Sequence, residues 1–232
     1  MKNVIFSVVL LGSVVVAAQQ AVALPIPSAD GFNTISLSEL DTAPTGWTVI
    51  PTASGQTSGT VDWIARGNGW NITCFNNSMG CIDLDGSTYR AGVMTTAGSF
   101  QLLAGKTYQL SAQISGNQRT SNSDQVEFGF LRGSNLTGAF ATGTRSVSIP
   151  GSAGYNLYSV YFTPTANTNA RVFFYDVGGT SNSGPILDNV ILRAVPLPAA
   201  AWLMLSGVAA LFAVARRRRG GNELHTAGGA VA

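Results

Sequence analysis

Short runs of alternating polar and apolar residues recur through the long middle of this chain and restrict it to β structure. In Thr107–Ser115, the residues Tyr108, Leu110, Ala112 and Ile114 fall on one face, and the residues between them are polar. A strand packed on one side has this pattern, because successive side chains point to opposite faces of a sheet. Between residues 24 and 194 no stretch keeps the apolar period of about 3.6 residues that marks a helix.

Turns rich in Gly, Asn and Ser separate these runs, which is typical of antiparallel strands. The predicted strands are Trp47–Ile50, Thr60–Ile64, Gly80–Leu84, Ser99–Leu103, Thr107–Ser115, Gln125–Leu131, Arg145–Ile149, Asn156–Thr163, Ala170–Asp176 and Ile186–Arg193. Many short strands in one domain favour an all-β fold, an antiparallel β-sandwich, most simply a jelly roll.

An apolar run of 17 residues from Ala199 to Ala215 lies near the C-terminus and precedes a basic cluster. The cluster consists of Arg216, Arg217, Arg218 and Arg219. A helix over the run covers about 25 Å, the lower limit for crossing a bilayer. The arginines stay in the cytoplasm, so everything before the helix lies outside. A buried core helix is the alternative, and consecutive arginines argue against it. The sequence thus predicts one C-terminal transmembrane helix.

The N-terminus is typical of a secretory signal peptide. Lys2 supplies the positive charge, Val4–Ala18 the apolar region, and Ala21-Val22-Ala23 the small-residue cleavage site. A retained membrane anchor is the alternative. We expect a signal peptide over 1–23, an exported β-sandwich domain over 24–194, a sorting segment over 195–219 and a short cytoplasmic tail over 220–232.

Charge and histidine content exclude several classes of function. Lys2 and the four tail arginines account for five of the 13 basic residues, and Glu223 for one of the 11 acidic residues. The exported domain therefore has a net charge near −2, with no basic excess for nucleic acid. Its sequence also contains no histidine, because His225 lies in the tail. This excludes Ser-His-Asp and Cys-His catalysis and histidine zinc sites from the domain.

The C-terminal segment resembles a known sorting signal. Val195, Pro196, Leu197, Pro198 and Ala199, followed by the apolar run and the arginine cluster, are similar to the tripartite PEP-CTERM signal in its VPLPA variant. Leu197 replaces the usual Glu, and 13 residues follow the cluster. The resemblance implies a Gram-negative, polysaccharide-producing bacterium in which the Sec translocon exports the chain. An exosortase in the inner membrane then recognises the two prolines and removes the helix. The protein would be membrane-anchored transiently and then reside at the cell surface or in the extracellular matrix.

A second resemblance covers nearly the whole exported domain. The motifs are GWTV at 46–49, VDWI at 61–64, IDLDG at 82–86, AGKTYQLSAQISGN at 104–117 and GPILDNVIL at 184–192. In this order they resemble the exported choice-of-anchor C type of domain, which is related to galactose-binding-like jelly rolls and to carbohydrate-binding modules. In those modules a structural calcium often joins an early acid to an Asp in the last strand. Asp188 has the late position and Glu39 is the candidate early partner. The alternative is that Asp188 and Asn189 bond neighbouring backbone groups.

Cys74 and Cys81 are the only cysteines and have six residues between them. After export they lie in an oxidising compartment, so we expect a disulfide that pins a surface loop. A metal or redox pair is the alternative, but the sequence has neither a CxxC motif nor a neighbouring histidine.

Asp83 and Asp85 share one face of a predicted strand and precede Gly86. Three roles remain open for them: a structural turn, a calcium or ligand contact, or a catalytic pair of the kind glycosidases use.

Sugar rings stack on exposed aromatic side chains, for which Trp70, Trp63 and Tyr89 are candidates. Trp63 lies in an alternating strand that also favours a core position. Arg119, in a turn, is a further candidate for contact with ligand hydroxyls or carboxylates, with a solvated turn as the alternative.

The function we expect is that of an exported surface or matrix protein, not an enzyme, which binds exopolysaccharide. One alternative is a purely structural or adhesive protein without a specific ligand. An extracellular carbohydrate-active enzyme is the other.

Overall fold

The computed structural model describes residues 23–24, 32–53, 55–136, 141–196, 207–209 and 211–212. The chain divides into one compact unit, Ala21–Val195, and a second unit of Met1–Gln20 with Pro196–Ala232. In the second unit, residues 207–209 and 211–212 are helical. Within the described part of the chain, no helix is long and apolar enough to cross a membrane. The predicted signal peptide and transmembrane helix lie largely outside the described residues and stay predictions.

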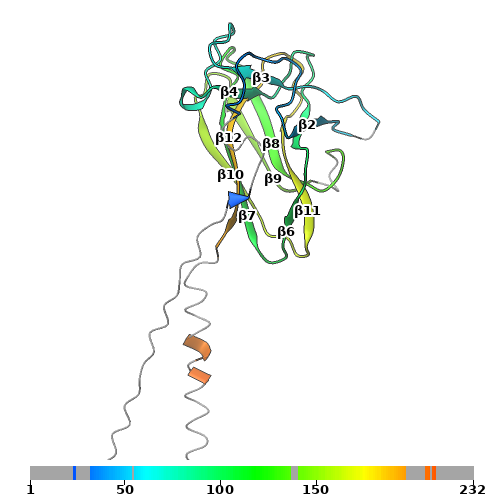
Figure 1. The fold of residues 1–232 in the computed structure, drawn as a ribbon, viewed down its shortest axis with the longest axis vertical. Coiled ribbons are helices and arrows are strands. Elements are labelled where there is room, and N and C mark those ends of the chain that lie inside the picture. The colour runs from blue at the N-terminus through cyan, green and yellow to red at the C-terminus, as the bar shows by residue number, and fades with distance from the viewer. Residues whose placement is uncertain are drawn as a thin grey trace, which may run out of the picture. The chain divides into compact units, whose positions relative to one another are not determined.

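The compact unit contains two antiparallel sheets (Figure 1). The first has the order β10 (Asn156–Phe162), β7 (Thr107–Ser115), β12 (Ile186–Val195), β4 (Gly80–Asp83) and β3 (Asp62–Ala65), with β1 (Ala23–Leu24) also paired to β12. The second has the order β2 (Trp47–Ile50), β5 (Val93–Thr96), β11 (Thr168–Asp176), β8 (Ser123–Leu131) and β9 (Ala141–Pro150), with β6 (Phe100–Leu102) also paired to β11. Strands distant in the sequence are neighbours in both sheets.

The core lies between the sheets and is built from the apolar side of each alternating strand. Leu110 and Ile114 of β7 are fully buried there. Phe128 of β8 pairs with Phe174 of β11, and their rings stack with centroids 5.7 Å apart. Full burial of one such side chain contributes about 1.5–3 kcal/mol. The predicted β-sandwich is confirmed.

Each predicted strand overlaps an observed one, but β5 was not predicted. Val93–Thr96 is buried on both faces, because Met94 belongs to the central core and Val93 to a smaller apolar cluster with Phe173 on the other side of the sheet. A short strand that is covered on both sides shows no polar alternation, so its sequence lacks the signal that identified the others.

The predicted disulfide joins Cys74 and Cys81, with their Cα atoms 5.4 Å apart. It closes a loop that contains a 3₁₀ turn, η1 (Phe75–Asn77). The two cysteines pack with Ile64 and Ile186, whose neighbours in β3 and β12 point into the central core. The loop therefore covers part of the outer face of the first sheet.

Candidate functional site

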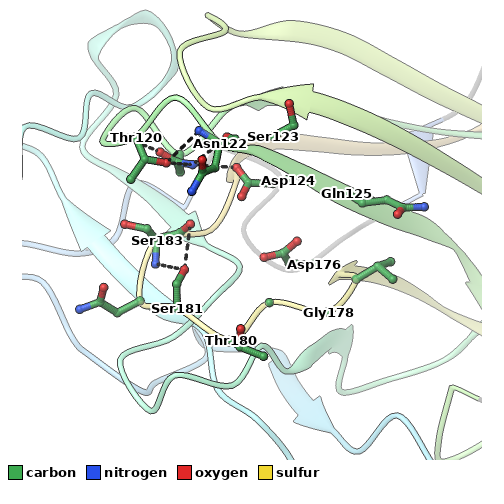
Figure 2. Close-up of a pocket in the computed structure, with 14 residues that line it drawn as sticks. Thr120, Asn122, Ser123, Asp124, Gln125, Asp176, Gly178, Thr180, Ser181 and Ser183 are labelled. Carbon is green, nitrogen blue, oxygen red and sulfur yellow. Dashed lines mark hydrogen bonds between the residues drawn. The ribbon is translucent and has the colours of Figure 1, made fainter.

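A polar pocket of about 470 Å³ lies between the loop that joins β7 to β8 and the loop that joins β11 to β12 (Figure 2). We call it the loop-end pocket. One wall consists of Asn117, Thr120, Asn122, Ser123, Asp124 and Gln125. The other consists of Asp176, Val177, Gly178, Gly179, Thr180, Ser181, Asn182 and Ser183. Most of these side chains carry a hydroxyl, amide or carboxyl group.

Asn117 holds the first wall in place. Its Oδ1 accepts hydrogen bonds from the backbone N–H groups of Arg119 and Thr120 at 2.9 and 2.7 Å. Its Nδ2 donates to Oδ2 of Asp124 at 3.0 Å. Asn117 is buried, so this amide is shielded from water and fixes both the turn and the orientation of Asp124.

Glycines shape the second wall next to Asp176. Gly178 has a φ of 77°, a conformation that favours glycine. A Cβ on Gly179 would lie 2.5 Å from Oδ2 of Asp176, so a larger residue would displace that carboxyl group. Further along the loop, the N–H and Oγ of Ser181 donate to Oδ2 of Asp85 at 2.8 and 2.9 Å.

Three carboxyl groups interact electrostatically around the pocket. Burial raises the pKa of Asp85 and of Asp124 above the ordinary value of 3.8. Burial, followed by the negative charges of Asp124 and Asp85, raises the pKa of Asp176 to about 7. Figure 2 shows the carboxyl group of Asp176 between the two loops. At neutral pH this group is therefore protonated part of the time and offers both a donor and an acceptor.

Arg119 does not have the predicted role of a ligand contact. Its guanidinium forms an ion pair with Asp83, whose side chain is fully buried. Oδ1 of Asp83 also accepts the N–H groups of Asp85 and Gly184 at 3.0 and 2.8 Å. Burial raises the pKa of Asp83 well above 3.8, and the positive charge of Arg119 opposes that rise. Compensation of a buried carboxylate is a structural role for Arg119, and contact of its guanidinium with a ligand stays a prediction.

The three aromatic candidates separate by exposure. Trp63 is only 6% exposed, and its Nε1 donates to the backbone oxygen of Phe32 at 3.1 Å. It belongs to the core, the position that its alternating strand also favours, and is not exposed for stacking. Trp70 is 41% exposed and Tyr89 is 63% exposed. Neither lines the loop-end pocket, and their role in sugar stacking stays a prediction.

Asp188, the candidate late calcium ligand, makes hydrogen bonds within the protein, and a calcium contact for it stays a prediction. Its Oδ2 accepts the N–H of Phe75 at 2.9 Å and the hydroxyl of Ser78 at 2.8 Å, and its Oδ1 accepts the N–H of Asn189 at 2.7 Å. This carboxylate ties the disulfide loop to β12. The backbone of Glu39 forms an isolated antiparallel bridge with that of Trp63 in β3, and Glu39 is exposed. Among the described residues, no group of three His, Cys, Asp or Glu side chains is arranged to hold a metal ion.

Sequence inspection missed Asp124 and Asp176, the two carboxyl groups that line the pocket. Both lie at strand ends beside turn residues, a weak signal that many structural acids share. The register between β8 and β11 pairs Asp176 with Val126, two residues from Asp124. Only this long-range pairing brings the two acids together.

No family model and no curated protein matches the sequence, but solved structures are similar to the fold. A cyclase from Fischerella sp. TAU aligns with 77% of this chain and 100% of its own, with a TM-score of 0.52 and 19% identity. The arabinose-bound MgGH51 α-L-arabinofuranosidase aligns with 72% of this chain and 26% of its own, with a TM-score of 0.50 and 15% identity. A CBM4 structure aligns with 64% of this chain and 86% of its own, with a TM-score of 0.42 and 13% identity. At these identities the first two likenesses show the β-sandwich fold alone.

Proposed function

We propose that this chain is an exported surface or matrix protein that binds the hydroxyl groups of a neutral polysaccharide in the loop-end pocket. The observation that carries the proposal is the lining of that pocket, which combines carboxyl, amide and hydroxyl groups from two loops. Each sugar hydroxyl both donates and accepts hydrogen bonds, so converging groups of these types suit it.

The pocket is held in shape by its own hydrogen bonds, which favours binding. Asp124 is oriented by Asn117, and Ser181 is oriented by Asp85. A ligand therefore orders few side chains when it binds, and the associated entropy cost is small. The carboxyl group of Asp176, with its pKa raised to about 7, can switch between donating and accepting.

Export and processing are the second part of the proposal. In it, the Sec translocon exports the chain across the inner membrane of a Gram-negative bacterium, and an exosortase removes the segment after Pro196 and Pro198. The Cys74–Cys81 disulfide supports an oxidising compartment. We assign the exported domain to the galactose-binding-like jelly rolls on the motifs of its sequence.

The binding proposal is tested with the full chain in non-ionic detergent and a panel of immobilised neutral polysaccharides, including cellulose, xylan and galactan. We expect Asp124→Ala and Asp176→Ala each to weaken retention about tenfold, the effect of losing about 1.4 kcal/mol. Glu39→Gln, an exposed change outside the pocket, is the matched control. Loss of binding in Trp70→Ala with full binding in the pocket variants would move the site to the aromatic surface. No retention of the unaltered chain on any polymer would favour a structural or adhesive protein without a ligand.

A second candidate function is glycoside hydrolysis, favoured by one observation. Asp176, with its raised pKa, and Asp124 lie together in an open pocket, and glycosidases use one protonated and one ionised carboxyl group. Release of reducing sugar from the same polymers, abolished by Asp176→Asn, would establish hydrolysis. Binding without release would establish the non-enzymatic function.

A further inference from the structure

A hydrogen-bonded row of side chains crosses the outer face of the first sheet, away from the loop-end pocket. Strands β10, β7 and β12 lie side by side (Figure 1), and their register aligns Tyr161, Gln109 and Arg193. Nε2 of Gln109 donates to the hydroxyl of Tyr161 at 2.9 Å, and Nε of Arg193 donates to Oε1 of Gln109 at 2.7 Å. We call these three residues the Tyr161 row. Their chain neighbours Leu110 and Leu192 are in the core, so the row faces outward.

The row presents an aromatic ring in a fixed orientation. Gln109 is buried beneath its neighbours, whereas Tyr161 is 58% exposed and Leu157 on the same strand is 61% exposed. Gln109 also donates to the hydroxyl of Ser159 at 3.1 Å, so all three hydrogen bonds of its amide group serve this surface. Because the hydrogen bonds restrain Tyr161 and Arg193 before any ligand arrives, binding orders them at little entropic cost.

Two cations lie near this surface. Arg193, a member of the Tyr161 row, is exposed. Arg145 of β9 lies beside β10, where its guanidinium donates to the backbone oxygen of Ser159 at 2.8 Å and lies 5.5 Å from the ring centroid of Tyr158, which packs against the core. Among the described residues, no carboxylate is in ion-pair contact with either arginine.

The acids of this sheet lie toward its opposite end. Asp62 of β3 pairs with Asp83 of β4, and Asp83 pairs with Ile186 at the first residue of β12. Asp188 pairs with Gln113 and its carboxylate is committed to the disulfide loop. The Tyr161 row thus lies in a part of the sheet where the fixed charges are positive, although the exported domain as a whole is slightly acidic.

We propose that the Tyr161 row binds an acidic polysaccharide, a polymer of uronate sugars. A sugar ring stacks on Tyr161, and the guanidinium of Arg193 binds a carboxylate. The two residues are two strands apart, about 10 Å, so a chain that crosses the strands contacts both. This inference rests on the proposed polysaccharide-binding function but uses a different surface, because the acidic loop-end pocket repels such a polymer.

The test uses the full chain in non-ionic detergent and polygalacturonate as the probe, with affinity measured by calorimetry at low and high salt. Arg193→Gln is expected to weaken binding about tenfold and to reduce the salt dependence. Tyr161→Ala is expected to weaken it to a similar extent. Tyr161→Phe keeps the ring and removes one hydrogen bond, so it should retain most of the affinity. Arg66→Gln, on an exposed arginine outside the row, is the matched control.

Further measurements distinguish binding at this site from binding at the loop-end pocket and from binding to a membrane surface. Asp124→Ala should leave polygalacturonate binding intact, and Arg193→Gln should leave retention on neutral polymers intact. Carboxyl-reduced polygalacturonate is neutral, so we expect the parent chain and Arg193→Gln to bind it with equal affinity. The inference is overturned if polygalacturonate does not bind at low salt or binds Arg193→Gln unchanged. Binding to phosphatidylglycerol vesicles in place of polygalacturonate would also overturn it.

Discussion

Asp176 is the side chain whose ionisation couples the loop-end pocket most directly to stability. Its pKa is about 7 in the folded protein against an ordinary 3.8, because burial and the charges of Asp124 and Asp85 disfavour the carboxylate. The folded state therefore holds the proton more tightly than the unfolded chain. The resulting stabilisation is fully present below about pH 4 and is lost as the pH rises through about 7.

Asp176→Asn should make the melting temperature less dependent on pH. The amide keeps the shape of the carboxyl group but cannot ionise, so we expect the variant to melt several degrees higher than the parent at pH 8. About 1 kcal/mol changes the Tm of a domain of this size by about 2–4 °C. The pKa of Asp83 is also raised, so the melting temperature of the variant should still fall somewhat as the pH rises. Calorimetric scans between pH 4 and pH 8 check this, and an unchanged slope would contradict the assignment to Asp176.

The disulfide loop is held to the first sheet by three kinds of contact. The Cys74–Cys81 bond closes it, and Asp188 accepts its backbone and hydroxyl protons. Gln118 exchanges two hydrogen bonds with the backbone of Thr73, at 2.9 and 3.0 Å. Sequence inspection found the covalent contact, because a lone cysteine pair in an exported domain predicts it. It left Asp188 open between a calcium contact and bonds to neighbouring backbone groups, since nothing local shows which group an acid will meet across the fold.

Because these contacts restrain one loop, their contributions to stability should not add. Replacing both cysteines by serine should lower the free energy of unfolding by about 2 kcal/mol. Asp188→Ala should lower it by about 1–3 kcal/mol, since it removes the acceptor for half-buried donors. In the triple variant the free energy of unfolding should fall by less than the sum of these two decreases. Either change alone already frees the loop, so the second change removes fewer effective restraints. Urea unfolding measures all three, and strict additivity would show that Asp188 acts independently of the loop.

Charge is distributed very unevenly over the whole molecule. The sequence pI of about 8.7 reflects Lys2 and the four tail arginines, whereas the domain over residues 24–194 is slightly acidic. Within that domain, carboxyl groups surround the loop-end pocket, and the Tyr161 row contains the exposed Arg193. Removal of both terminal segments would therefore lower the pI of the mature protein. The remaining domain would have an acidic surface at the loop-end pocket and a basic surface at the Tyr161 row.

The mature termini test the proposed export and processing. Mass spectrometry of the cell-surface fraction should find an N-terminus at Leu24 and a C-terminus before Ala199. Replacing Pro196 and Pro198 by alanine should preserve the full chain to Ala232, because the proposed exosortase would no longer recognise its motif. Pro164→Ala is the control. An intact C-terminus in the parent protein would show that the tail acts as a permanent anchor.

Local patterns in the sequence were sufficient for most of the strands and for the disulfide. The side-chain period of two that identified Thr107–Ser115 is a property of neighbouring residues, so it can be detected before any partner strand is known. The pattern failed at Val93–Thr96, where burial on both faces removes the alternation. It also left Trp63 open between core and surface.

The binding surfaces depend on pairings between distant parts of the chain. The register of β11 with β8 brings Asp176 close to Asp124. Tyr161 and Arg193 are aligned on either side of Gln109 in β7. Arg119 forms its ion pair with Asp83, which lies 36 positions earlier in the sequence. Strand order and register set these neighbours, and both follow from burial of the whole core. Local alternation therefore predicts a β-sandwich, whereas the location of its polar sites emerges only when the sheets assemble.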